Sequence, residues 1–237
     1  MPPTIVLVHG AFADPGTWDG VIDPLMSTGH VVIAAANPLR GLAADAAAVS
    51  DLVRAIDGPV LLVGHSYGGA VITNVDAEAG EIVGLVYVAA FAPELGECAS
   101  QLQDMFPGST LGDALEPVPR SDDTTDLYIA ADRFHSQFCA DVPAARAARL
   151  AAKQRPVTHE ALVEPSGDGP LWQALPSWFL FGELDRNIPA ELEHFMARRA
   201  RAHRVTEIPG ASHAVPVAHP DATAHVIREA ASLRVAA

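Results

Sequence analysis

A serine flanked by glycines stands where a predicted strand gives way to a predicted helix. Residues 64–68 read Gly-His-Ser-Tyr-Gly, which places Ser66 at the centre of a G-x-S-x-G pattern. Glycine is needed on both sides because side chains there would collide across a sharp turn. The turn lifts the serine hydroxyl above the sheet, and the helix that follows offers N–H groups to developing negative charge. Ser66 is therefore a candidate nucleophile for acyl transfer.

A nucleophilic serine needs a base that takes its proton, and histidine commonly fills this role. The chain has ten histidines, so position has to select among them. His213 follows the last predicted strand in the segment Pro-Gly-Ala-Ser-His, which places it on the same sheet edge as Ser66. We interpret His9 as structural, and we expect His65 to point away from the serine hydroxyl. Six more are expected at the surface, namely His135, His159, His194, His203, His219 and His225.

The base in turn needs a carboxylate that orients it. Residues 182–185 read Gly-Glu-Leu-Asp and directly follow a predicted strand, so their loop opens on the edge that carries Ser66. Strand-end geometry favours Asp185 as this carboxylate, and Glu183 remains the alternative. The candidates then occur along the chain in the order serine, acid, histidine.

Negative charge that forms on a substrate oxygen needs backbone N–H donors. Residues 9–12 read His-Gly-Ala-Phe at the end of the first predicted strand. Because parallel strands end on one edge, this loop is expected to open beside Ser66. We expect the N–H groups of Ala11 and Tyr67 to form an oxyanion hole, with Phe12 as the second choice after Ala11.

These loops depend on strands and helices that alternate along the chain. Short apolar runs without polar alternation indicate strands that are buried on both faces. The sequence therefore predicts an α/β fold with a mostly parallel sheet of about six strands and helices on both faces. The predicted strands are 4–8, 30–35, 60–63, 82–90, 177–181 and 204–208, and the predicted helices are 18–28, 42–56, 70–79, 189–201 and 221–233.

The strand signal disappears between about residues 93 and 176. Helix-like pieces are predicted there at 97–106, 124–139, 143–154 and 158–163. This predicts a helical cap (lid) at residues 94–175, inserted into a core formed by residues 1–93 and 176–237. The substrate pocket is expected between the cap and the sheet edge. Aromatic candidates for its lining are Phe12, Phe91, Tyr128, Phe134, Phe138 and Trp172.

Together, the motifs at residues 6–12, 64–69, 182–185 and 210–213 resemble the α/β-hydrolase superfamily. The start of the chain at the strand before the His-Gly loop is similar to compact serine esterases, namely the plant methyl-ester esterase and hydroxynitrile lyase subgroup and related bacterial hydrolases. The resemblance implies a triad of Ser66, His213 and Asp185, an acyl-enzyme, and neither cofactor nor metal. The lyases carry a lysine after the histidine, whereas Ala214 stands here and disfavours lyase activity.

We therefore expect a serine hydrolase that cleaves a carboxylic ester, or a related acyl bond, of a small and largely apolar molecule. One alternative is a perhydrolase, which uses the same three residues. The other is a receptor-like, ligand-binding member of the fold with slow or no ester turnover.

The composition limits the partners of the protein. The 237 residues carry a formal net charge of −14, which disfavours binding to nucleic acid and to anionic membranes. A small-molecule substrate and a monomer or homodimer are expected. Without a signal-peptide pattern or an apolar run of membrane length, the sequence predicts a cytoplasmic protein. Two cysteines, Cys98 and Cys139, form no disulfide framework, although one bond between them stays open.

Overall fold

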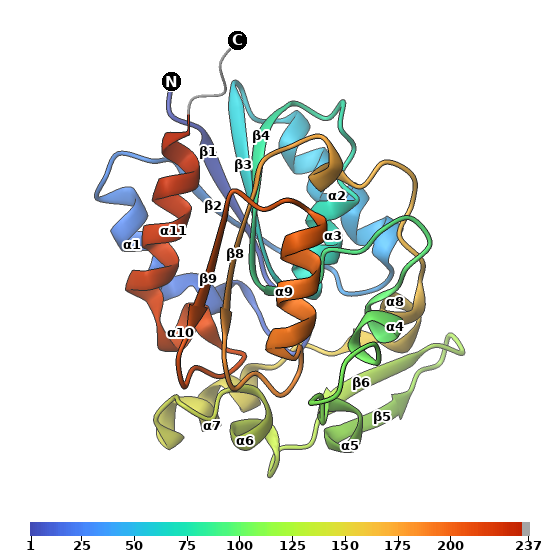
Figure 1. The fold of residues 1–237 in the computed structure, drawn as a ribbon. Helices are drawn as coiled ribbons and strands as arrows, with labels where there is room; N and C mark the ends of the chain where they lie inside the picture. Colours follow the sequence, from blue (N-terminus) through green and yellow to red (C-terminus); the bar gives the residue numbers. More distant parts are fainter. Residues whose placement is uncertain (234–237) are drawn as a thin grey trace.

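A single large sheet forms the centre of the computed structural model, which describes residues 1–233 (Figure 1). Its six strands are all parallel and lie in the order β2-β1-β3-β4-β8-β9. This confirms the predicted sheet; the last four residues of the predicted core segment lie outside the described residues. The strands are β1 (Thr4–Val8), β2 (Val32–Ala35), β3 (Pro59–Ser66), β4 (Glu81–Ala90), β8 (Ser177–Gly182) and β9 (Arg204–Ile208).

Burial explains why the central strands are apolar along their whole length. Nearly all residues of β1, β3, β4 and β8 are buried, whereas the edge strands β2 and β9 are largely half-buried or exposed. A strand covered by helices on both faces has no side from which a polar residue reaches water. Each fully buried aliphatic or aromatic side chain stabilises the fold by about 1.5–3 kcal/mol.

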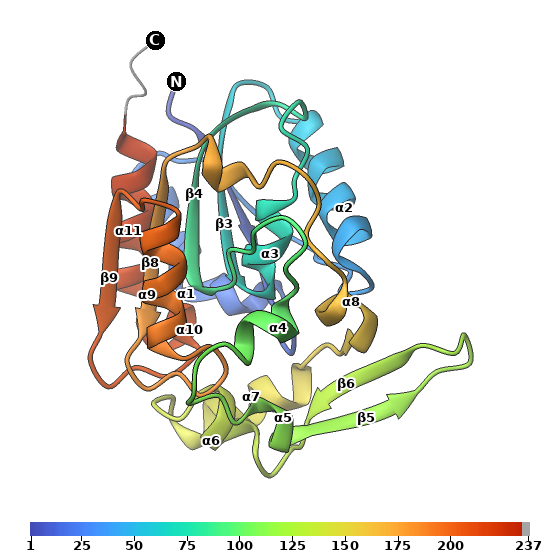
Figure 2. The same cartoon turned by 45° about the vertical axis from the view of Figure 1, so that its right-hand side comes forward.

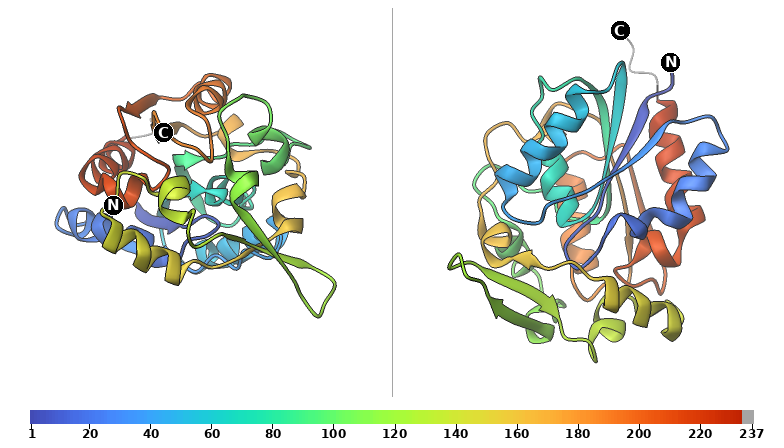
Figure 3. Two further views of the ribbon diagram at one scale, coloured as in Figure 1. Left: turned by 90° about the horizontal axis from the view of Figure 1, so that it is seen from below. Right: turned by 180° about the vertical axis from the view of Figure 1, so that it is seen from behind.

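Helices cover both faces of the sheet. α1 and α11 pack against each other on one face, whereas α2, α3 and α9 cover the other (Figures 1 and 3). The core helices are α1 (Asp19–Met26), α2 (Leu42–Arg54), α3 (Tyr67–Thr73), α9 (Ala190–Arg199), α10 (Val215–Ala218) and α11 (Pro220–Ser232), with 3₁₀ turns η1 (Pro15–Trp18) and η2 (Leu171–Gln173).

The segment between β4 and β8 forms a cap over the carboxyl ends of the sheet strands (Figure 2). It contains a three-stranded sheet ordered β5-β6-β7 with antiparallel pairing, so the cap is not purely helical. In Figure 3 the β5–β6 hairpin projects from the body of the molecule. The cap elements are α4 (Ala99–Gln103), α5 (Leu111–Ala114), β5 (Leu115–Pro119), β6 (Thr125–Ile129), α6 (Phe134–Phe138), α7 (Ala144–Lys153), β7 (Val157–Thr158) and α8 (His159–Val163).

The prediction of one helix over residues 124–139 is wrong, because β6 and α6 divide this segment. Two prolines in β5, Pro117 and Pro119, hid the hairpin, since proline has no N–H to donate to a strand partner. The structure accommodates them because β5 lies at the edge of its sheet and pairs only with β6. A strand that contains proline is therefore compatible with this position.

The two cysteines do not form a disulfide. Cys98 and Cys139 are both buried and free. Burial, together with the nearby Asp141 carboxylate, raises the pKa of the Cys139 thiol to about 12.

Among residues 1–233, none of the helices combines the length and the apolar character that crossing a membrane requires.

The close approach of α3 to β1 leaves no room for a side chain at Gly68. A Cβ atom added to Gly68 would lie 2.4 Å from the carbonyl oxygen of Val8. We predict that Gly68→Ala lowers the free energy of unfolding by about 2–3 kcal/mol, because backbone has to move to admit the methyl group. Urea denaturation measures the change.

The matched control is Gly112→Ala in α5, where an added Cβ would meet no atom within 4 Å. Its stability is expected to stay equal or to rise by up to about 1 kcal/mol. Equal stability of the two variants would contradict the steric explanation.

Candidate active site

Strand β3 continues directly into helix α3, and Ser66 is the residue at the junction. Its backbone has φ 55° and ψ −124°, a combination that residues other than glycine rarely adopt. The loop after β1 approaches this junction so closely that a Cβ on Gly10 would lie 2.5 Å from the Cβ of Ser66. The predicted turn therefore exists, and close packing explains the glycine of the His-Gly pair.

The structure brings Asp185 and His213 together. Nδ1 of His213 lies 2.6 Å from Oδ2 of Asp185, and both side chains are fully buried. The N–H groups of Asn187 and Ile188 donate to Oδ1 of Asp185 at 2.7 and 3.0 Å, which fixes the direction of the carboxylate. Because Nδ1 faces a carboxylate, it carries the proton. This leaves Nε2 as the basic nitrogen, and Nε2 has no hydrogen-bond partner within the described residues.

The alternative carboxylate, Glu183, has a different role. Glu183 is exposed, and its Oε2 accepts the N–H of Gly210 at 2.8 Å. It therefore braces the turn that leads to His213. His65 supports the same loop, since its Nε2 lies 3.1 Å from the carbonyl oxygen of His213 and donates to it. Burial, with His213 nearby, holds the pKa of His65 well below its ordinary value, so the ring stays neutral.

The candidate oxyanion donors differ in their availability. The N–H of Phe12 donates to the carbonyl of Arg155 in the cap at 3.1 Å, which occupies it. Within residues 1–233, no such bond engages the N–H of Ala11, and both Ala11 and Tyr67 line the cavity above the serine. Tyr67 is the first residue of α3, so its N–H has no acceptor within the helix. Of the three candidates, Ala11 and Tyr67 are thus the two whose N–H groups are not taken by a backbone acceptor in the described part of the chain.

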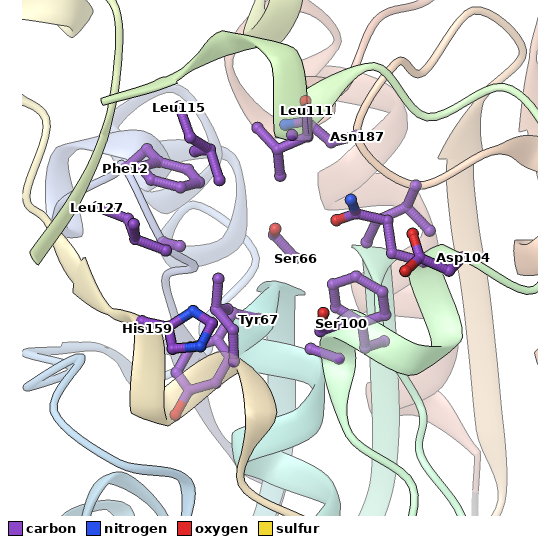
Figure 4. Close-up of a pocket in the computed structure, with 17 residues that line it drawn as sticks. Phe12, Ser66, Tyr67, Ser100, Asp104, Leu111, Leu115, Leu127, His159 and Asn187 are labelled. Atoms are coloured by element: carbon purple, nitrogen blue, oxygen red, sulfur yellow. The ribbon is translucent and has the colours of Figure 1, made fainter. Parts of the chain in front are cut away.

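A cavity of about 260 Å³ opens at Ser66, between the sheet edge and the cap. Figure 4 shows the serine hydroxyl at its centre. Two of the predicted aromatic residues, Phe12 and Phe91, line this cavity. Leucines from the cap form much of the remaining wall, and sequence reasoning missed them because it considered only aromatic side chains. These leucines are Leu111, Leu115, Leu127 and Leu162.

The other predicted aromatic residues, Tyr128, Phe134, Phe138 and Trp172, do not line this cavity. Phe138 stands behind it, with its ring centroid 5.0 Å from that of His213 in an edge-on contact. Phe134 stacks on Phe138 at 5.1 Å. Phe138 therefore covers one side of the imidazole with an apolar ring, and Phe134 packs behind Phe138.

The positions of the two remaining aromatic residues have simple physical reasons. Tyr128 follows Leu127 on β6, and successive residues of a strand point to opposite sides. Since Leu127 faces the cavity, Tyr128 faces away from it. The Nε1–H of Trp172 donates to the carbonyl of Pro93 at 2.9 Å, and the guanidinium of Arg199 lies over its ring. Trp172 thus anchors the point where the cap leaves the core.

Known proteins resemble this chain in sequence and in fold. The sequence profile of the alpha/beta hydrolase family matches residues 5–226. The chain belongs to this family. A carbendazim hydrolyzing esterase of Nocardioides sp. (strain SG-4G) is 36% identical over 105 residues, which cover 39% of this chain and 43% of that protein. The match thus spans less than half the length of this relative.

Solved structures of other hydrolases share the fold. Polyneuridine aldehyde esterase superimposes with a TM-score of 0.80 and 17% identity over 97% of this chain and 99% of that chain. The pyrethroid hydrolase of Sphingobium faniae JZ-2 gives a TM-score of 0.75 and 20% identity over 97% of both chains. An extracellular alpha/beta-hydrolase from a Paenibacillus species gives 0.75 and 24%, over 97% and 99%. At 17–24% identity, these likenesses show the fold alone.

The cap of this alpha/beta hydrolase is bonded to the loop that carries His213. Asp141 lies between α6 and α7, and its carboxylate accepts the N–H of Ser212 at 3.2 Å and the Ser212 hydroxyl. Nε2 of His219 lies 3.0 Å from the same carboxylate. One cap residue therefore binds residues on both sides of His213 along the chain.

A second polar connection joins the cap to the residue after the serine. The hydroxyl of Tyr67 donates to Asp45 at 2.9 Å, and Asp45 also accepts the backbone N–H of Arg40 at 3.1 Å. The Arg40 guanidinium forms an ion pair with Asp126 of β6 at 2.5 Å. Leu127, the next residue of β6, lines the cavity. The cap wall and the serine turn are thus held by one chain of contacts.

His9 has the structural role that the sequence predicts. Its Nε2 accepts the N–H of Asn37 at 3.2 Å, so Nδ1 carries the proton and lies 2.9 Å from the carbonyl oxygen of Gly10. A second proton on Nε2 would disrupt the contact with Asn37. Burial lowers the pKa of His9 to about 4, with the positive charge of Arg155 acting in the same direction.

This shift predicts a loss of stability in acid. Between pH 6.5 and about 4 the unfolded chain binds a proton at His9 that the folded chain does not, so stability falls as pH falls through that window. From about pH 7 to about pH 5 the wild type should lose about 2 kcal/mol more than His9→Gln. Urea denaturation at both pH values measures this, and identical losses would contradict it.

Proposed function

We propose that this protein is a serine hydrolase that cleaves a carboxylic ester, or a related acyl bond, of a small and largely apolar molecule through an acyl-enzyme. One observation carries the proposal. Ser66, held in a strained turn at the centre of the cavity, shares the carboxyl edge of the sheet with the buried pair of Asp185 and His213. Nucleophile, base and orienting acid then come from the ends of three parallel strands.

The proposed reaction has two steps. Nε2 of His213 takes the proton of the Ser66 hydroxyl as the oxygen attacks the ester carbonyl, and the N–H groups of Ala11 and Tyr67 bind the oxyanion. His213 then gives the proton to the departing alcohol, which leaves an acyl group on Ser66. In the second step His213 takes a proton from water, the resulting hydroxide attacks the acyl group, and the acid is released as Ser66 regains its proton.

Several features support an apolar ester as the substrate. The cavity wall includes Phe12, Phe91 and four leucines, which bury an apolar group. The relative from Nocardioides and two of the structural neighbours bear the names of esterases or of a pyrethroid hydrolase. Ala214 occupies the place after His213 where the resembled lyases have a lysine, and this favours hydrolysis over lyase chemistry.

Removal of the nucleophile is the first test. Ser66→Ala is expected to lower kcat on p-nitrophenyl butyrate by at least about a thousandfold, because only binding and the oxyanion donors remain. A fluorophosphonate probe is expected to label the wild type at Ser66 and to leave the variant unlabelled, as mass spectrometry would show. Full activity of a folded Ser66→Ala variant would refute the proposal. Labelling of the wild type without turnover of any ester would instead favour a receptor-like protein.

A matched pair of variants tests the acid. Asp185→Asn is expected to lower kcat by about 10³–10⁴-fold, because an amide reverses the hydrogen bond that keeps Nδ1 protonated. Glu183→Gln is expected to keep kcat within about twofold, since Glu183 touches the turn and not the imidazole. Steady-state kinetics on the same ester measures both. The opposite ranking would assign the role to Glu183.

A further inference from the structure

One wall of the cavity is polar, and it comes from a single cap helix. Ser100 and Gln103 of α4 and Asp104 directly after it all line the cavity. They are spaced by three and four residues from Ser100, so they share one face of the helix. Leu102, on another face, is fully buried against the protein. α4 thus turns its polar face toward Ser66 and its apolar face toward the core.

The three side chains are not engaged by the part of the chain that the structure describes. Within residues 1–233, neither Ser100 nor Gln103 nor Asp104 uses its side chain in a hydrogen bond or ion pair of the protein. Other cap carboxylates are engaged, since Asp126 pairs with Arg40 and Asp141 binds Ser212. Asp104 is exposed to water at the cavity, so a ligand group that donates hydrogen bonds can replace that water without leaving a charge buried.

The opposite wall is mostly apolar, with His159 as an exposed polar residue beside Leu127. Figure 4 shows Phe12, Leu115 and Leu127 on one side of the Ser66 hydroxyl, and Ser100 and Asp104 on the other. Among the 17 residues that line the cavity, Asp104 is the only aspartate or glutamate, and lysine and arginine do not occur. With histidine counted as neutral, the formal charge of the lining is therefore negative, and neither lysine nor arginine lines the site to bind a carboxylate or phosphate of a substrate.

We propose that the substrate class is a neutral or cationic ester with two sides. Its apolar side packs on Phe12, Leu115 and Leu127, and a hydrogen-bond-donating group, an ammonium or an amide, faces Ser100, Gln103 and Asp104. Asp104 is the specificity-determining residue because it is the charged acceptor on the polar wall. This inference rests on the proposed hydrolase function and adds the class of ester that the site selects.

Two pairs of esters of matched shape test the inference. The first pair is 2-(dimethylamino)ethyl acetate, protonated at neutral pH, and 3-methylbutyl acetate, which replaces its N–H⁺ by C–H. The second pair, methyl 4-(dimethylamino)butanoate and methyl 5-methylhexanoate, makes the same change on the acyl side. Both are needed because either end of the ester can face α4. For each pair the ratio of kcat/KM, ammonium to hydrocarbon, is measured by pH-stat titration.

Asp104→Asn is expected to lower this ratio by about two- to fivefold in at least one pair, the range of an exposed charge pair. The change is expected in KM, because the contact is the same in the ground state and the transition state. The difference in this kcat/KM ratio between wild type and Asp104→Asn should shrink in about 0.5 M salt, where charges are screened. Asp57→Asn is the control, since Asp57 is exposed before β3, at the sheet edge opposite the cavity. It is expected to leave the ratio unchanged.

The outcomes separate this inference from the function on which it rests. If the hydrocarbon esters are cleaved and both ratios are the same in wild type and Asp104→Asn, the inference is wrong and the hydrolase function stands. If turnover is too slow to measure, the concentration of each ester that protects Ser66 from the fluorophosphonate is measured instead. The ratio of these concentrations within each pair then replaces the ratio of kcat/KM. If the probe does not label Ser66 and no ester is cleaved, the proposed function fails, and the inference fails with it.

Discussion

The left-handed backbone at Ser66 is the constraint on which the rest of the structure depends. A residue stays in such a conformation only where its surroundings leave no alternative. Here α3 lies so close to β1 that Gly68 has no room for a side chain, and the N–H of Phe91 donates to the Ser66 carbonyl at 3.2 Å. The central position of β3 in the sheet therefore supports the strain, and the hydroxyl is presented to the cavity before any ligand binds.

Burial of the Asp185–His213 pair is the second requirement of the site, and the cap contributes to it. An unpaired carboxylate in this position would destabilise the fold, so two backbone N–H groups and the imidazole share its charge. The ring of Phe138, which comes from the cap, covers the imidazole. The cap thus helps to bury the imidazole of His213, in addition to forming the cavity wall.

The sequence alone predicted what depends on local pattern. Asp185 and His213 each follow a predicted strand, and parallel strands end on one edge, so their proximity follows from topology. The β5–β6 hairpin was not predictable in the same way, because the prolines of β5 suppress the strand signal and only the edge position permits them. The leucines of the cavity were missed for another reason, since periodicity identifies an apolar residue as buried but does not say which cavity it faces.

The base of the cap has a consequence for the evolution of the family. The N–H of Gly96 donates to the carbonyl of Ser166 at 2.9 Å, and the N–H of Ser166 donates to the carbonyl of Glu97 at 2.8 Å. The ends of the segment 97–166 are therefore close together whatever its length, and a longer segment adds little to the entropy cost of loop closure. A different cap could be exchanged into this place while the sheet register stays intact. Substrate range and reaction chemistry can thus change separately, because α4 and the hairpin are encoded in one exchangeable segment.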